Sequence, residues 1–293
     1  MASSARVGVS SGSRALPSIR TTELGWSALK YALVVVVLFC LLLPIYWIFS
    51  SSIKPERDFF VNPPAFVFQP TLINYERTLS DLQFLTYLRN SVIVSFAATG
   101  LTLVVASLAA HGLARFYFPG AKVIAIAILA ARLVPGATMV MPYYVLFRWY
   151  GLVNTIPGLI LAYVGFSLPF ACWLLYGFFL EIPSDVEDSA RIDGCSDFGV
   201  FWRIVLPLTR PGLAAAAILV FLGTWNEFLF ALVLAGRDTR TLPVYLATFI
   251  SERTVFWGSL FSVASFMVLP CLVLVLLVQR SLVRGLTAGA VKG

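Results

Sequence analysis

Charged residues are scarce in this sequence. Asp, Glu, Lys and Arg make up 12% of its 293 residues, whereas about a quarter of the residues are charged in a typical soluble domain. Hydrophobic residues make up 59%, and the mean hydropathy is +0.89. This composition excludes a soluble globular protein and predicts an integral membrane protein.

Residues suited to phosphate or metal chemistry are also few. No lysine follows the Gly-x4-Gly frame of a phosphate-binding loop; the lysines are Lys30, Lys54, Lys122 and Lys292. The single histidine, His111, has no Cys or carboxylate cluster at metal-ligand spacing, so we expect it to be packed or interfacial. The four cysteines imply no disulfide framework. The sequence therefore predicts no catalytic residue and no metal site.

Long apolar runs are abundant. A helix needs about 20 predominantly apolar residues to cross the hydrocarbon core of a bilayer. Six runs of roughly this length cover residues 29–52, 91–113, 123–146, 158–180, 213–234 and 258–278. The first is too long for a cleaved signal peptide, and no small-residue cleavage site follows it. The predicted fold class is an all-α polytopic membrane protein with six transmembrane helices.

These runs divide the chain into three parts. Residues 1–27 are predicted to be a disordered cytoplasmic tail, because about the first 20 of them are rich in Ser, Ala and Gly with scattered Arg. Residues 28–285 form the six-span domain, including a loop at 181–210, and residues 286–293 form a C-terminal tail. The longest outer connection, 53–90, is expected either to pack as a cap or to contact an external partner.

The distribution of Lys and Arg predicts the orientation, because positive charge near span ends is retained on the cytoplasmic side. With six spans, both termini lie on one side. That side carries 12 Lys and Arg residues in its tails and connections, and the other carries 8. We therefore expect cytoplasmic termini and a cytoplasmic 181–210 loop. The net charge of +7 then reflects membrane orientation and gives no indication of nucleic acid binding.

The 181–210 loop carries the start and stop signals of two short helices. Ser184 and Glu187 fit a capping box and Gly194 fits a left-handed helix end, which predicts a first helix of about nine residues and about 13 Å. Ser196 predicts the start of a second helix, and Pro207 is expected to end it before the fifth span. The residues of this second helix expected to face the membrane-side core are Phe198, Phe201, Trp202 and Val205.

Small residues ringed by charge mark one face of this loop. The small residues are Ser189, Ala190, Gly194 and Cys195. The charged residues around them are Glu187, Asp188, Arg191 and Asp193. Small residues let another protein's backbone approach closely, and charges at a rim fix the register of a contact. We therefore predict a docking surface, with a plain solvated connection as the alternative.

The order and spacing of residues in this loop resemble the EAA loop of ABC importer permeases. That pattern runs Glu-Ala-Ala, three intervening positions, Gly, and an Ile-x-Leu-Pro ending. Here it reads Asp188–Ser189–Ala190, then Gly194, then Ile204–Val205–Leu206–Pro207. Asp188 stands where Glu is usual, and Ser189 stands where the first Ala is usual.

The resemblance extends over nearly the whole chain from the first span onward. Residues 279–293 are similar to the C-terminus of the maltose/trehalose-type carbohydrate permeases, specifically the smaller of the two paired subunits. Further matches are Gly151–Leu152–Val153–Asn154–Thr155, Trp225–Asn226–Glu227–Phe228 and Thr241–Leu242–Pro243.

The resemblance implies a type I ABC importer permease with the MetI-like fold, in the plasma (inner) membrane of a bacterium or archaeon. Such a permease pairs with a homologous second permease subunit and two cytoplasmic ATPase subunits, and an extracytoplasmic sugar-binding protein delivers the solute. This chain would then be a transport subunit and not an enzyme. It would bind no cofactor directly, and the ATPase subunits would use ATP and Mg²⁺.

The resemblance also assigns contacts, because residues 184–208 correspond to the coupling helix that seats in a cleft of the ATPase subunit. The implied ATPase-coupling residues are Glu187, Asp188, Ser189, Ala190, Arg191, Asp193, Gly194, Cys195 and Pro207. The C-terminal tail is implied to reach the ATPase interface through Gly289, Ala290, Val291 and Lys292.

Polar residues inside predicted spans mark a second candidate site, since a charge at membrane depth is costly and usually faces a cavity or a partner. The predicted translocation-path residues are Arg132, Thr224, Asn226 and Glu227. For Glu227 three roles stay open: structural pairing or helix packing, lining or gating the path, and direct sugar contact. Arg132 is expected to snorkel or pair. An interfacial belt, or alternatively a sugar-stacking platform, is predicted for Tyr143, Tyr144, Trp149 and Tyr150.

Other functions stay as alternatives. The solute of such a permease could be glycerol-3-phosphate or another small polar molecule, because related permeases share these signatures. An ion-coupled secondary transporter would need intramembrane carboxylates and repeats, but Glu227 is the single acidic residue well inside a predicted span and no second half repeats the first. A membrane enzyme or receptor would need a catalytic constellation or a soluble output domain, and the sequence shows neither.

Overall fold

The computed structural model describes residues 19–63, 65–250 and 255–288. The chain forms two compact units, residues 1–47 and 48–293, and each is described by itself. Within the described residues the regular structure is helical, with one isolated bridge between Ile250 and Val255 and no strand. The predicted all-α class is confirmed.

Helix α1 (Ile19–Ser52) makes up the described part of the first unit and ends at the start of the second. Its segment Leu29–Ser52 is long and apolar enough to cross a membrane, with a mean hydropathy of 2.8. Its apolar side chains from Leu29 to Leu43 are exposed within this chain. Such a surface is suited to lipid or to another membrane helix.

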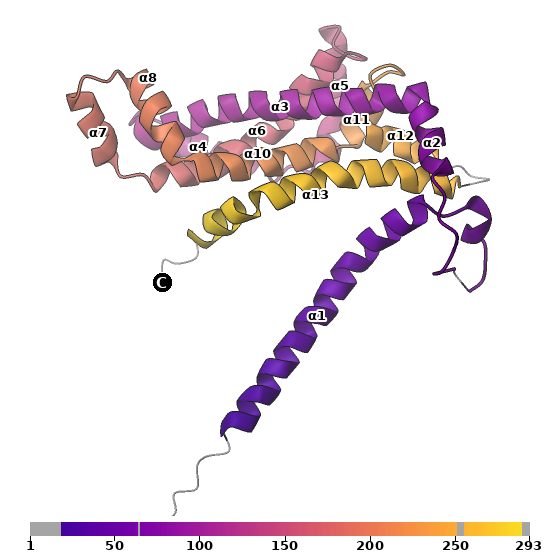
Figure 1. The fold of residues 1–293 in the computed structure, drawn as a ribbon. Helices are drawn as coiled ribbons and strands as arrows, with labels where there is room; N and C mark the ends of the chain where they lie inside the picture. The colour runs from indigo at the N-terminus through magenta and orange to yellow at the C-terminus, as the bar shows by residue number, and fades with distance from the viewer. Residues whose placement is uncertain (1–18, 64, 251–254, 289–293) are drawn as a thin grey trace, which may run out of the picture. The chain divides into compact units, whose positions relative to one another are not determined.

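Four long helices run alongside one another and form the body of the second unit (Figure 1). They are α3 (Leu82–Arg115), α6 (Ile156–Leu180), α10 (Arg210–Trp225) and α13 (Trp257–Ala288). α3 packs along α6, and α10 packs against α3, α6 and α13. Fully buried alanines lie on these helices, including Ala98, Ala106 and Ala171. Small side chains let membrane helices approach closely, so the sequence supports tight packing here.

The third predicted span is broken, although residues 123–146 were predicted to form one helix. α4 (Ala121–Ala131) and α5 (Gly136–Trp149) are separated by residues 132–135 and bent by 103°. Pro135 is in an extended conformation at the start of α5. Proline has no N–H to donate and disfavours the helical conformation of the residue before it, so Pro135 favours a break at this point.

The fifth predicted span is also interrupted. α10 ends at Trp225, and α11 (Leu229–Leu234) begins after three intervening residues. In the described residues, four helices are long and apolar enough to cross a membrane, and the count reaches the predicted six if each of two bent pairs forms one span. These pairs are α4 with α5, and Asp197–Leu208 with α10, which are bent by 77°.

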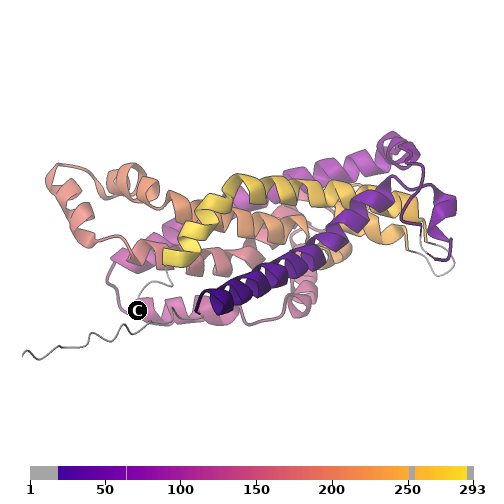
Figure 2. The ribbon, with the colours of Figure 1, turned by 60° about the horizontal axis from the view of Figure 1, so that its bottom comes forward.

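Short helices collect at the two ends of the second unit (Figures 1 and 2). One end, which we call the loop end, holds α7 (Ser184–Ile192), α8 (Asp197–Val200), a π-helical turn (Phe201–Val205) and α9 (Leu206–Leu208). The opposite end, which we call the far end, holds the 3-10 turn Glu56–Phe59, α2 (Ile73–Ser80) and α12 (Leu242–Thr248).

Buried polar side chains close the far end. Asn90 is fully buried, and its Nδ2 donates to the carbonyls of Asp238 and Arg240 at 2.8 and 3.0 Å. The N–H of Leu242 donates to Ser91 Oγ at 2.8 Å. These bonds fix the start of α12 against α3.

The 53–90 connection is packed as a cap. Asn74 is buried, and its Nδ2 donates to the carbonyls of Ser52 and Lys54 at 3.0 and 2.9 Å. The buried Lys54 donates from Nζ to the carbonyl of Ala65 at 2.8 Å. Contact between this connection and an external partner stays a prediction.

Candidate functional site

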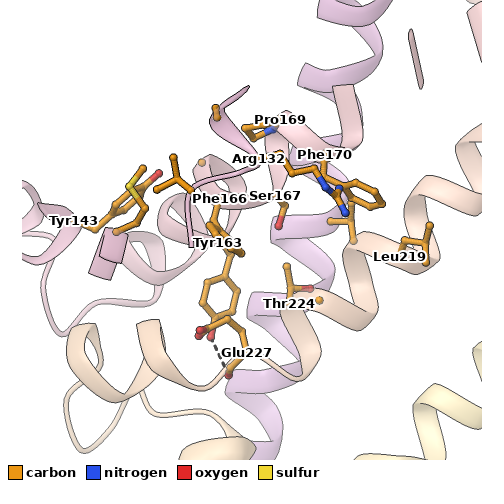
Figure 3. A pocket seen from close by; sticks show the side chains of 16 residues that line it. Arg132, Tyr143, Tyr163, Phe166, Ser167, Pro169, Phe170, Leu219, Thr224 and Glu227 are labelled. Atoms are coloured by element: carbon orange, nitrogen blue, oxygen red, sulfur yellow. Dashed lines mark hydrogen bonds between the residues drawn. The ribbon is translucent and has the colours of Figure 1, made fainter. Parts of the chain in front are cut away.

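A cavity of about 550 Å³ lies between α6, α10 and the break between α4 and α5 (Figure 3). Its aromatic lining is Tyr143, Tyr163, Phe166 and Phe170. Its polar lining includes Arg132, Ser167, Thr224 and Glu227. An apolar, aromatic wall with a few polar groups is typical of a site for a small organic molecule.

Glu227 lies at the cavity and stabilises the start of α11. Its Oε1 accepts a hydrogen bond from the N–H of Phe230 at 3.0 Å, and its Oε2 accepts one from the N–H of Ala231 at 3.2 Å. The positive end of the helix dipole favours a carboxylate at this position. Among the roles left open for Glu227, the geometry shows both a structural cap and a lining residue.

Tyr163 joins the two walls of the cavity beside Glu227. Its ring is 1% exposed, and its hydroxyl donates to the backbone carbonyl of Glu227 at 3.5 Å, as Figure 3 shows. This distance is at the long limit for an O–H donor, so the bond is weak.

Arg132 lies in the break between α4 and α5 and points over an aromatic ring. Its guanidinium carbon lies 3.9 Å from the centroid of the Phe170 ring (Figure 3), which is a cation–π geometry. The expected pairing of Arg132 is therefore with a ring of α6. This contact places a positive charge on the cavity lining.

Of the two other predicted translocation-path residues, Thr224 lines the cavity and Asn226 does not. Thr224 is buried on the cavity lining, and its Oγ1 donates to the carbonyl of Phe221. Asn226 is exposed and is absent from the cavity lining; its Nδ2 donates to the carbonyl of Leu222 and lies 3.9 Å from Cys271 Sγ on α13. The chain turns after Trp225, where α10 ends, so the neighbours Asn226 and Glu227 face different elements.

The aromatic belt predicted on the third span is divided. Trp149 and Tyr150 are exposed, at 81% and 72%, as an interfacial belt requires. Tyr143 instead lines the cavity and packs edge-on against Phe230 of α11. The bend at Pro135 reorients α5, and no periodic pattern in the sequence indicated it.

At the loop end, the predicted capping box is wrong. Pro183 occupies the cap position in an extended conformation, Ser184 is the first helical residue, and no side chain caps α7. Glu187 does not reach back, because its side chain is 1% exposed and paired with Arg115 of α3. Ala190, one turn further on, is also buried. The predicted surface therefore loses Glu187 and Ala190, which lie on the inner face of α7.

The other residues of that surface remain accessible. Asp188, Ser189, Arg191, Asp193 and Gly194 are exposed, and Cys195 is half-buried. The φ of Gly194 is +88°, which confirms the predicted left-handed helix end. We call these six residues the loop surface.

Arg191 joins α7 to α8. Its Nη1 lies 2.7 Å from Asp188 Oδ1, and its Nε lies 2.9 Å from Asp197 Oδ1. The hydrogen bond to Asp197 is the main cause that raises the pKa of Arg191 above its usual value. The Ser196 hydroxyl accepts from the N–H of Gly199, which confirms the predicted start of the second helix.

Only two of the four residues that were predicted to face the core from the second helix of the loop are buried. Phe201 and Val205 are buried as predicted, but Phe198 and Trp202 are 68% and 50% exposed. The π-helical turn Phe201–Val205 changes the residue spacing, so one face of a regular helix does not continue through it. Phe198 and Trp202 lie next to Gly194 around a shared hollow and extend the apolar part of the exposed loop.

Pro207 does not end the second helix as predicted. It lies half-buried at the start of α9, where a missing N–H is tolerated. The change of direction comes at Thr209, between α9 and α10. The predicted tail contacts Gly289, Ala290, Val291 and Lys292 lie outside the described residues.

A bundle of membrane-length helices around a polar and aromatic cavity, with a two-helix loop at one end, is the architecture of a multi-pass membrane transport protein. Residues 25–288 match the family described as "Binding-protein-dependent transport system inner membrane component". The chain belongs to this family.

Several of its relatives are named as sugar transport permeases. The chain is 39% identical over 258 residues to the trehalose transport system permease protein SugB of Mycobacterium tuberculosis, covering 86% of this chain and 93% of SugB. It is 36% identical over 256 residues to the trehalose/maltose transport system permease protein MalG of Thermococcus litoralis, covering 86% of this chain and 92% of MalG. The resemblance to carbohydrate ABC permeases that the sequence motifs indicated is confirmed.

A solved structure supports the fold. The chain is similar to a chain of a bacterial ABC transporter involved in the import of the acidic polysaccharide alginate, with a TM-score of 0.77 and 21% sequence identity. The match covers 88% of this chain and 97% of the other. The predicted importer-permease fold is confirmed.

Proposed function

We propose that this chain is a permease subunit of an ATP-driven sugar importer. The observation that carries the proposal is the continuity of α6. This helix lines the cavity with Tyr163, Phe166 and Phe170, and residues 181–183 connect it directly to α7. A movement imposed on the loop therefore has a short covalent route to the cavity wall. The sugars in the names of the relatives support a saccharide as the solute.

The cavity provides part of the translocation path, and a homologous second permease subunit provides the rest. Aromatic rings offer faces for the apolar side of a sugar ring, and Thr224, Ser167 and Arg132 offer polar groups for its hydroxyls. Glu227 shapes this wall by fixing the start of α11.

The loop surface docks in a cleft on one of two ATPase subunits, which bind and hydrolyse ATP with Mg²⁺. Asp188, Arg191 and Asp193 fix the register of the contact, while Gly194 lets the partner backbone approach. The loop end and both termini are then cytoplasmic, and the tail residues 289–292 add to the same interface. A sugar-binding protein delivers solute at the far end.

The cavity chemistry separates this proposal from its alternatives. Glycerol-3-phosphate would draw on Arg132, the cation of the cavity lining, but it has no sugar ring to lie against the aromatic lining. Ion coupling through Glu227 is disfavoured, because both carboxylate oxygens already accept backbone hydrogen bonds.

Affinity purification of the tagged chain from its own cells, followed by transport in proteoliposomes, tests the proposal. We expect a second permease and an ATPase to co-purify. We also expect ATP-dependent uptake of trehalose, maltose or diacetylchitobiose when the binding protein is supplied. Uptake of glycerol-3-phosphate in preference to all three sugars would overturn the sugar assignment. Uptake driven by an ion gradient without ATP would overturn the importer class.

A further inference from the structure

A buried ion pair ties the loop to two long helices. The side chain of Glu187 in α7 is 1% exposed, and its Oε1 lies 2.5 Å from Arg115 Nε at the end of α3. Arg115 Nη2 also donates to the carbonyls of Phe179 and Ile182, at 2.9 and 2.6 Å, where α6 ends. One guanidinium group therefore cross-links α3, α6 and α7.

The same carboxylate continues the network toward α8. Glu187 Oε2 lies 3.5 Å from His111 Nε2 and 3.7 Å from Arg191 Nη2. His111 is enclosed by aromatic rings, with Phe201 at 5.0 Å between centroids. Arg191 in turn binds Asp197 of α8. Charged contacts thus run from α3 through α7 to α8.

We propose that Arg115 and Glu187 are positioning residues that make the loop and the ends of α3 and α6 move as one body. The inference rests on the proposed function, in which the loop transmits the movement of an ATPase to the cavity. Stability alone does not require this pair, because well-packed apolar residues often replace a buried ion pair without loss. The guanidinium offers something that apolar packing does not, a rigid fork of donors with fixed directions.

The double variant Arg115→Met/Glu187→Leu separates the two roles. It removes both charges together and fills the space with apolar atoms, so neither charge is left buried without a partner. We expect assembly with the ATPase to stay near the wild-type value. The thermal unfolding temperature should fall about as far as in the Asn90→Leu control described below, because each variant leaves two backbone carbonyls without a donor. We expect the amount of sugar moved per ATP hydrolysed to fall at least about fivefold, the lower end of a typical coupling between sites.

The measurement uses proteoliposomes holding the whole assembly and the binding protein, with radiolabelled trehalose, maltose and diacetylchitobiose supplied together. Asn90→Leu is the matched control, since Asn90 is also a buried α3 residue that bonds two distant carbonyls, at the far end. We expect it to lower thermal stability and leave the sugar moved per ATP unchanged.

The outcomes are distinct. A double variant that keeps wild-type sugar moved per ATP overturns the inference and leaves the proposed function standing. An equal loss in Asn90→Leu also overturns it, because any buried cross-link on α3 would then have the same effect. A wild-type assembly without ATP-dependent sugar uptake overturns the proposed function and this inference together.

Discussion

The carboxylates of the cavity and the loop end, Glu227 and Glu187, find their partners in different ways. At the cavity the partners are close in sequence: Glu227 accepts from the N–H groups of Phe230 and Ala231, three and four residues on, and Thr224 donates three residues back. At the loop end the partners of the Arg115–Glu187 pair are distant, because Arg115 binds groups 64, 67 and 72 residues away.

Because of this difference, the cavity wall can change shape, whereas the loop end cannot. Bonds within one helical turn travel with their element, so α11 and α10 can shift without losing them. The loop-end bonds join three helices, and any relative movement of those helices breaks them. The proposed function, in which an ATPase moves the loop and the cavity opens in response, requires this combination.

The largest expected effect follows from replacing Gly194 with Val. The open space at this position would accept a side chain, but the φ of +88° would not, because a left-handed conformation costs a residue with a Cβ about 1–2 kcal/mol. The added side chain would also keep the ATPase surface away. We expect Gly194→Val to abolish sugar uptake and to reduce ATPase co-purification, as measured with the tagged chain.

Gly177→Val controls for this variant, since Gly177 also faces open space but lies inside α6 with ordinary helical geometry. We expect it to keep uptake and ATPase association. If Gly194→Val also keeps both, the loop is only a connection, and the difference between the cavity and the loop end has no role in transport.

A pair of glycine variants sharpens the contrast in packing. A Cβ at Gly212 would overlap Phe178 Cγ. This ring atom is bonded to the Cβ of Phe178 and therefore has little freedom to move. A Cβ at Gly165 would meet the terminal hydroxyl of Tyr143, which can swing into the cavity. We expect Gly212→Ala to lower the free energy of unfolding in detergent by about 2 kcal/mol and Gly165→Ala by less than about 1 kcal/mol. Equal losses would contradict a softer cavity wall.

The sequence predicted features that depend on local chemistry. Gly194 in the left-handed region and Ser196 as a helix start need only their immediate neighbours, and both are confirmed. The burial of Glu187 was missed because its partner, Arg115, is 72 residues away. The capping-box pattern covers only Ser184 to Glu187, so it cannot show that Arg115 binds the Glu187 carboxylate in place of the backbone N–H.

The membrane helices were predictable as apolar runs, but their breaks were not. Leu133 and Val134 are apolar, so the run was read as continuous, although Arg132 and the Pro135–Gly136 pair mark the 103° bend. The gap after Trp225 depends on Glu227 capping a new helix, which hydropathy cannot register. The cavity lies at both breaks. For this reason the sequence analysis named only Tyr143 of its aromatic lining and did not predict Tyr163, Phe166 or Phe170.

Removing the cap at Glu227 should have a moderate effect. Glu227→Ala leaves the N–H groups of Phe230 and Ala231 without their acceptors, and we expect a loss of about 1 kcal/mol in the free energy of unfolding. Glu227→Gln keeps one acceptor oxygen and should lose less. If Glu227→Gln stops uptake while the protein level and stability stay normal, the charge itself acts in transport and the cavity contrast fails.

The smallest expected effect is that of Tyr163→Phe, which removes the one hydroxyl that joins α6 to the carbonyl of Glu227. That bond spans 64 residues, so it is the cavity's counterpart to the links of Arg115, but its length of 3.5 Å makes it weak. We expect the variant to lose less than about 0.5 kcal/mol of stability, below the usual value for a hydrogen bond, and to transport sugar normally.

Tyr163→Ala is the reference variant for this measurement, because removing a buried ring from the core should cost about 3 kcal/mol or more. Both unfolding in detergent and uptake in cells should be measured. A loss of about 2 kcal/mol or more in Tyr163→Phe would mean that a long-range bond holds the cavity as firmly as the ion pair holds the loop, and the two regions would then differ in composition but not in rigidity.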